Sequence, residues 1–135
     1  MQINKIQNQP AFTARLNLSG DIDILKPNEI KELAKKAKKI AGENDTINFH
    51  IDYLDWSTKS VPQKDGKNDI LTVFSRNILA NCKINGNESR QKNLTMFLTD
   101  ETHNCKWLPE DSVLNRPFEY MSRYMDKFAE KFPHV

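Results

Sequence analysis

The sequence has little of several residue types that define particular protein classes. Its two cysteines, Cys82 and Cys105, are too few for the disulfide framework of a small secreted domain. Its four glycines form neither a GxGxxG nor a GxxxxGK loop, so the common dinucleotide-binding and phosphate-binding loops are excluded. GxSxG, HExxH and CxxC are also absent, and with them the usual motifs of serine hydrolases, zinc proteases and zinc ribbons.

The chain also lacks a charge excess and a long apolar run. Its 20 basic and 18 acidic residues nearly cancel, so the whole molecule is not built for a polyanionic partner. No apolar stretch approaches the length of about 18 residues that a membrane-spanning helix needs. The start, MQINKIQNQPAF, has no apolar segment of a signal peptide. We therefore expect a soluble protein of the cytoplasm or another intracellular compartment, folded as one domain over residues 1–135 with a short tail at 1–9.

The first half of the chain predicts a strand, a helix and a second strand. Residues 11–18 alternate between apolar and polar side chains, which is typical of a half-buried strand. A helix is expected from 28 to 41, entered through Pro27 and stopped at Gly42. The second strand, from residue 46, should turn four side chains inward: Ile47, Phe49, Ile51 and Tyr53. The polar stretch that follows, DWSTKSVPQKDGKN, is interpreted as a loop.

The second half predicts a hairpin and a final helix. Asn85-Gly86 suits a two-residue turn between strands at 70–84 and 88–99. That turn would set Phe74 opposite Phe97, and the same register would set Val73 opposite Leu98 and Lys83 opposite Glu88. The last element carries an apolar stripe at helical spacing: Phe118, Met121, Met125, Phe128 and Phe132. The order β-α-β-β-β-α predicts an α+β two-layer sandwich, with two helices on a mainly antiparallel four-stranded sheet.

Five lysines in the first helix raise the possibility of nucleic-acid binding. At 100° per residue, the apolar residues of this helix fall within one arc, while the lysines spread over all of the remaining face together with glutamates. Lysines that bind phosphates would gather on one track. The pattern therefore favours a solvated helix face, and nucleic-acid binding ranks third among the possible functions.

Topology predicts that the long loops meet at one end of the sheet. Alternate strands of a meander run the same way, so we expect Asp55, Trp56, His103 and Trp107 to share a rim that binds a partner. Carboxylates, an imidazole and a thiol could also hold a metal there, and the candidate ligands are Asp21, Asp23, Asp55, His103 and Cys105. His103 and Cys105 form a lone His-x-Cys pair, so we predict no metal and no other cofactor. His50 is interpreted as an ordinary exposed side chain.

The leading hypothesis is a small, non-enzymatic interaction module with a protein partner of unknown identity. It relies mainly on the lack of catalytic motifs. The alternative is a small metal-dependent hydrolase with its site on the same rim. Self-association into a homo-oligomer is left open, and no membrane partner is expected.

Overall fold

The computed structural model describes residues 15–84 and 87–129, and it confirms the α+β fold with two helices on one sheet. The described chain contains five strands, two α-helices and two short 3-10 helices. In chain order they are β1 (Leu16–Gly20), η2 (Ile22–Ile24), α1 (Pro27–Ile40), β2 (Thr46–Ile51), β3 (Asp55–Pro62), β4 (Asn68–Ile84), β5 (Asn87–Thr102), η3 (Val113–Asn115) and α2 (Phe118–Ala129).

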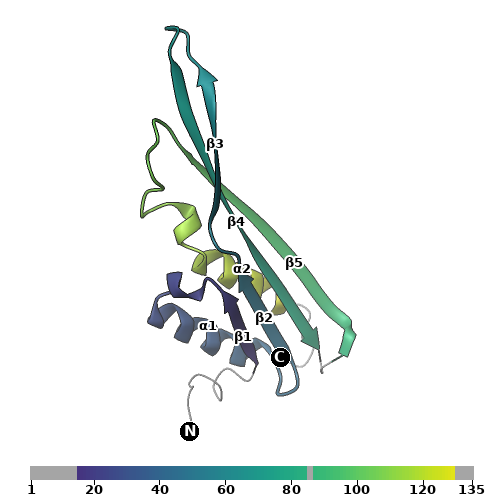
Figure 1. The fold of residues 1–135 in the computed structure, drawn as a ribbon. Helices are drawn as coiled ribbons and strands as arrows, with labels where there is room; N and C mark the ends of the chain where they lie inside the picture. The colour runs from purple at the N-terminus through teal and green to yellow at the C-terminus, as the bar shows by residue number, and fades with distance from the viewer. Residues whose placement is uncertain (1–14, 85–86, 130–135) are drawn as a thin grey trace.

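The 17-residue strand β4 organises the sheet (Figure 1). Residues 78–83 of β4 pair with β2, and residues 68–75 pair with β3, so β2 and β3 follow one another along the same edge. β5 pairs with the opposite edge of β4. β1 lies parallel to β2, and α1 forms the crossover between them.

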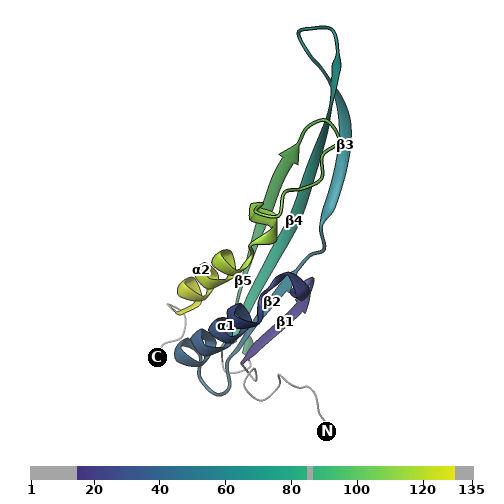
Figure 2. The ribbon, with the colours of Figure 1, turned by 90° about the vertical axis from the view of Figure 1, so that its left-hand side faces the viewer.

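The core lies between one face of the sheet and the two helices. Burial alternates along β4, and its even-numbered residues from Thr72 to Ile84 are buried. The predicted inward residues Ile47, Phe49 and Ile51 are buried too, but Tyr53 lies past the end of β2 and is 69% exposed. The helices contribute Leu33, Ala37, Met121, Met125 and Phe128 to this core. The other face of the sheet, which we call the open face, has no helix over it in the described residues (Figure 2).

The structure contains one strand more than the four expected, because residues 55–62 form β3. This segment is exposed almost throughout, so it lacks the apolar alternation from which a strand is predicted. It pairs with residues 68–75 of β4 through a turn at Gln63, where the Gln63 amide donates to the Lys67 carbonyl at 2.8 Å. The β3–β4 hairpin extends beyond the helices (Figures 1 and 2), and with residues 99–102 of β5 it forms a unit that we call the arm.

The predicted register of the β4–β5 hairpin is wrong over most of its length. The pair next to the turn, Ile84 and Asn87, fits the prediction, but the register then shifts at an irregularity between Cys82 and Ile84. Beyond it Phe74 faces Asp100, Val73 faces Glu101, and Phe97 faces Asn77. The predicted Lys83–Glu88 pair is not part of the ladder, and the tip, residues 85–86, lies outside the described residues.

A shift by three residues turns each side chain of β5 to the other face of the sheet. In the observed register Leu94, Met96 and Leu98 lie on the helix side, and Phe97 lies on the open face, 63% exposed. Three apolar side chains gain contact with the core and one loses it, which is the physical reason for this register.

The helix α1 has the predicted two-sided pattern. Leu33, Ala34, Ala37 and Ile40 are buried, while Lys31, Lys35, Lys38 and Lys39 are exposed. Lys36 differs from these lysines, because its Nζ lies 2.6 Å from the Asp126 carboxylate and 3.0 Å from the Ser122 hydroxyl of α2. Lys36 therefore connects the two helices.

Candidate functional site

The predicted rim tryptophans come together on the arm, on the side of the sheet that carries the helices. Trp56 faces Phe74 across β3 and β4, and Trp107 comes from the loop after β5. The Trp107 ring packs edge-on against both, with centroids 5.1 Å from Trp56 and 5.0 Å from Phe74. Phe74 is fully buried, whereas Trp56 is 51% and Trp107 60% exposed. We call the two tryptophans the indole pair.

A clamped turn presents Trp107. The Asn104 amide donates to Asp69 of β4 at 3.0 Å, and His103 forms an ion pair with the same carboxylate. The Thr102 hydroxyl donates to the Lys106 carbonyl at 2.5 Å. The hydrogen bond from His103 is the main cause that lowers the pKa of Asp69. These contacts fix the start of the loop to β4, so Trp107 is held over Phe74.

The turn also contains unusual backbone. Asn104 and Cys105 have φ values of 56° and 63°, in the left-handed region that residues with a Cβ rarely adopt. Farther along, the Ser112 hydroxyl donates to Asp100 of β5 at 2.8 Å, and Leu108 is buried. The loop is therefore attached on both sides of Trp107, which limits the motion of the exposed indole.

The other predicted rim residues do not join the indole pair in one cluster. Asp55 precedes Trp56 and accepts a hydrogen bond from its amide at 2.9 Å. His103 lies against Asp69, which β3 faces at Val61, well along the arm from Asp55. Cys105 is a free, exposed thiol.

The metal candidates are also dispersed. Asp21 binds Arg76, and Asp23 is exposed on η2. Within residues 15–84 and 87–129, no three His, Cys, Asp or Glu side chains are grouped as a metal site would need. The metal-dependent hydrolase hypothesis stays a prediction without a ligand cluster in the described residues.

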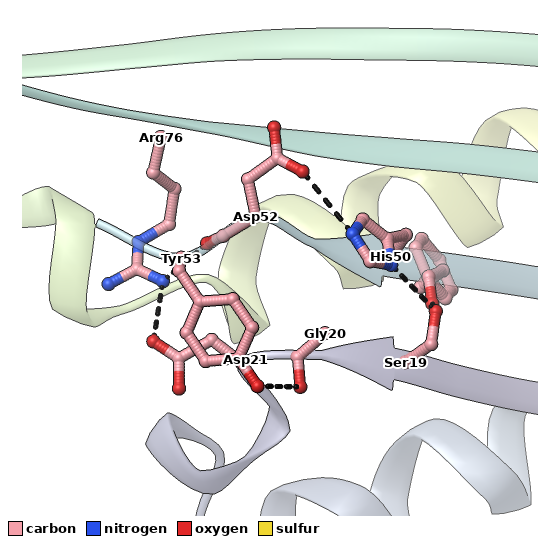
Figure 3. A network of polar contacts seen from close by, with 8 residues as sticks. Ser19, Gly20, Asp21, His50, Asp52, Tyr53 and Arg76 are labelled. Atoms are coloured by element: carbon pink, nitrogen blue, oxygen red, sulfur yellow. Dashed lines mark hydrogen bonds and ion pairs between the residues drawn. The ribbon is translucent and has the colours of Figure 1, made fainter. Parts of the chain in front are cut away.

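Arg76 forms a buried polar contact that the sequence does not reveal (Figure 3). Its Nη1 donates to the Asp21 carboxylate at 3.0 Å and to the Asp52 carbonyl at 2.8 Å. The residue is 3% exposed, and its Nε has no partner. Arg76 thus ties the ends of β1 and β2 to β4 at the point where the arm leaves the body of the sheet.

A row of four asparagines crosses the open face. Asn17, Asn48, Asn81 and Asn93 face one another in register on β1, β2, β4 and β5. Each side-chain amide donates to the carbonyl oxygen of the next, at 2.7, 3.0 and 2.6 Å. Such cross-strand amide contacts fix the register of the four strands on a face that has no apolar cover.

Beside this row, a serine, a histidine and an aspartate form a line (Figure 3). The Ser19 Oγ lies 2.8 Å from His50 Nδ1, and His50 Nε2 lies 3.3 Å from Asp52 Oδ1. Ser19 and His50 border a shallow hollow of about 260 Å³. The Ser19 hydroxyl has one proton, and the Phe49 carbonyl at 3.4 Å competes with the imidazole for it. The sequence signal was present, since Ser19 and His50 each follow a row asparagine by two residues and so share its face.

Comparisons with known proteins give only a distant similarity in fold. No protein family model and no curated protein matches the chain. The chain can be superposed on the crystal structure of the rare lipoprotein B from Shewanella oneidensis with a TM-score of 0.39 and 9% sequence identity. The match covers 85% of this chain and 93% of the lipoprotein chain. The crystal structure of a minor lipoprotein from Acinetobacter baumannii is 14% identical with a TM-score of 0.28, over 86% of this chain and 84% of that one.

Similarity at this level says nothing about the function of this chain. None of the helices in the described part of the chain is long and apolar enough to cross a membrane. The expected intracellular location stays a prediction.

Proposed function

We propose that this protein is a non-enzymatic binding module, and that the indole pair on the arm is the surface that contacts its partner. The observation that supports this most directly is the combined exposure of Trp56 and Trp107, each more than half accessible. Tryptophan is the largest apolar side chain and is enriched at the energetic centres of interfaces. Two exposed indoles in one place leave apolar surface that a partner can cover.

Trp107 is also held in place before binding, which lowers the entropic cost of binding. Trp107 rests against the buried Phe74 ring, and its loop is attached to Asp69 at one end and to Asp100 at the other. A side chain held in one position before binding loses little freedom when a partner arrives. Rigid aromatic anchors of this kind contribute more to affinity than mobile ones.

The charges near Trp107 indicate the chemistry of the partner. Residues 99–112 contain four carboxylates and one lysine. Asp100 faces Phe74 on the indole side of the sheet, whereas Glu101 faces Val73 on the open face. Glu110 and Asp111 belong to the loop that carries Trp107. An acidic surrounding with exposed indoles suits a protein segment that carries apolar side chains together with arginine or lysine, since cations bind to indole faces.

The test compares three forms of the full chain as bait in quantitative affinity capture from the cells that produce it. Trp56→Ala/Trp107→Ala should lose a partner that the wild type captures. Tyr53→Ala removes an aromatic ring of similar exposure from outside the arm and should retain the partner. Salt should weaken the retained complex, since the proposed contact includes charges. A partner captured equally by all three forms would refute the indole pair as the contact surface.

A second candidate function, acyl transfer by Ser19, is favoured by the line of Ser19, His50 and Asp52. In the tautomer with the proton on Nε2, His50 can accept the serine proton while it donates to Asp52, which is the arrangement of a nucleophile, a base and an orienting carboxylate. Hydrolysis of p-nitrophenyl acetate tests it. The candidate is supported if the wild type hydrolyses the ester faster than buffer alone and both Ser19→Ala and His50→Gln lose this excess rate. A rate that survives Ser19→Ala rejects it.

A further inference from the structure

The outer edge of β5 is the long unpaired edge of the sheet. Among the described residues β5 pairs only with β4, and Figure 1 shows its outer side free of any other described helix or strand. An unpaired edge presents backbone N–H and C=O groups that can add another strand. A 16-residue strand presents many of them.

The other two edge strands carry features that prevent such pairing, and the middle of β5 does not. β1 is five residues long and ends in a glycine, while β3 has a lysine in its middle, Lys59, and a proline at its end, Pro62. Residues 93–99 of β5 read NLTMFLT, without a charge, a proline or a glycine. Such a segment on an edge is prone to pair with another strand.

The exposed side chains of this segment gain from being covered. Phe97 is 63% exposed on the open face, and Leu94 and Met96 on the helix side are only partly buried against the core. They lie on the last strand of the sheet, so no neighbouring strand shields their outer side in the described chain. A further strand along β5 would cover residues on both faces at once.

The segment is complementary to itself in the antiparallel direction. With Met96 opposite Met96, Leu94 faces Leu98, Thr95 faces Phe97, and Asn93 faces Thr99. All three apolar residues of the helix side then meet apolar residues, and on the open face a β-branched side chain meets an aromatic ring, a favourable cross-strand pair. A two-fold interface requires this reciprocity, in which each contact occurs twice.

We propose that two copies of this chain associate through β5, in antiparallel register with Met96 on the two-fold axis. The two sheets then form one continuous sheet, with the helices of both copies on the same side. The interface is closed, because each copy uses the same edge, so the product is a dimer and not a fibre. The indole pair takes no part in this contact, and the inference is independent of the function proposed for it.

Analytical ultracentrifugation of the purified chain over a wide concentration range tests the proposal. We expect a species of twice the 15.7 kDa of one chain. Thr95→Lys/Phe97→Lys and Thr95→Glu/Phe97→Glu should each be monomeric, since both sites are exposed in one copy and like charges would meet across the axis. Circular dichroism checks that both variants fold. An equimolar mixture of the two variants should recover the dimer, because lysine then faces glutamate in both pairs between positions 95 and 97 of the two copies.

Trp56→Ala/Trp107→Ala is the matched control and should dimerise like the wild type. A wild type that stays monomeric at all concentrations, or charged variants that dimerise as the wild type does, would overturn the proposal. So would oligomers that grow without limit, since they require two different surfaces. Failure of the mixture to form dimers while each variant is monomeric would reject the proposed register.

Discussion

Replacement of Gly20 by alanine should destabilise the fold far more than the same change at Gly66. Both glycines have φ values in the left-handed region, +82° and +84°, where an alanine is strained. They differ in their surroundings. A Cβ on Gly66 meets nothing within 4 Å, whereas a Cβ on Gly20 would lie 2.1 Å from the Ile51 carbonyl oxygen.

The expected magnitudes follow from this difference. At Gly66 the cost is the strain of an L residue in the left-handed conformation. Alanine also restricts the unfolded chain, which offsets part of this strain, so the net loss of stability is about 1 kcal/mol. At Gly20 the backbone must move away from Ile51. That movement breaks the 2.8 Å hydrogen bond that the Asp21 backbone amide donates to the Ile51 carbonyl, and the loss costs about 1 kcal/mol.

The movement also withdraws Asp21 from the buried Arg76. Because Asp21 is partly exposed, the charge left without its partner costs about 3 kcal/mol. The three contributions sum to about 5 kcal/mol, comparable to the whole stability of many domains.

Urea denaturation followed by far-UV circular dichroism measures both variants. We expect Gly20→Ala to be largely unfolded without urea, and Gly66→Ala to unfold cooperatively near the wild-type midpoint. Asp21→Asn adds an internal check, since Gly20→Ala should cost less in that background than in the wild type if both changes act through Arg76. Equal destabilisation by the two glycine variants would refute the reasoning.

Three further outcomes are expected. Lys36→Gln should lower the free energy of unfolding by up to about 1 kcal/mol in urea denaturation, because Lys36 bridges the two helices. The same substitution at the exposed Lys35, Lys38 or Lys39 should leave the free energy of unfolding unchanged. Asn48→Ala removes two cross-strand hydrogen bonds and should cost about 1–2 kcal/mol by the same assay, and a neutral result would show that the asparagine row adds no stability. His103→Gln should raise the pKa of Asp69 toward 3.8 in an NMR titration. The substitution should lower the free energy of unfolding above pH 3.8, and this loss should disappear as the pH falls through the lowered wild-type pKa of Asp69. An unchanged pKa would contradict the contact.

The sequence by itself determined the features that depend on local periodicity. The apolar arc of α1 and the inward residues of β2 are where the pattern places them, because side-chain direction repeats every 3.6 residues in a helix and every two in a strand. The α+β class follows from the order of these elements.

Only the tertiary structure decided which residues meet across strands. β3 exists because the far half of β4 offers it an edge, and its own residues carry no strand pattern. The hairpin register near the turn was predictable, but one irregularity beside Cys82 shifts every later pair and turns Phe97 outward.

The same holds for the polar contacts of Arg76, of Ser19 with His50, and of the asparagine row, which join residues 12–55 positions apart in the chain. Periodicity specifies the face on which a side chain lies, whereas its partner depends on the register between strands. That register is set by the apolar burial of the whole sheet and cannot be read from one segment alone.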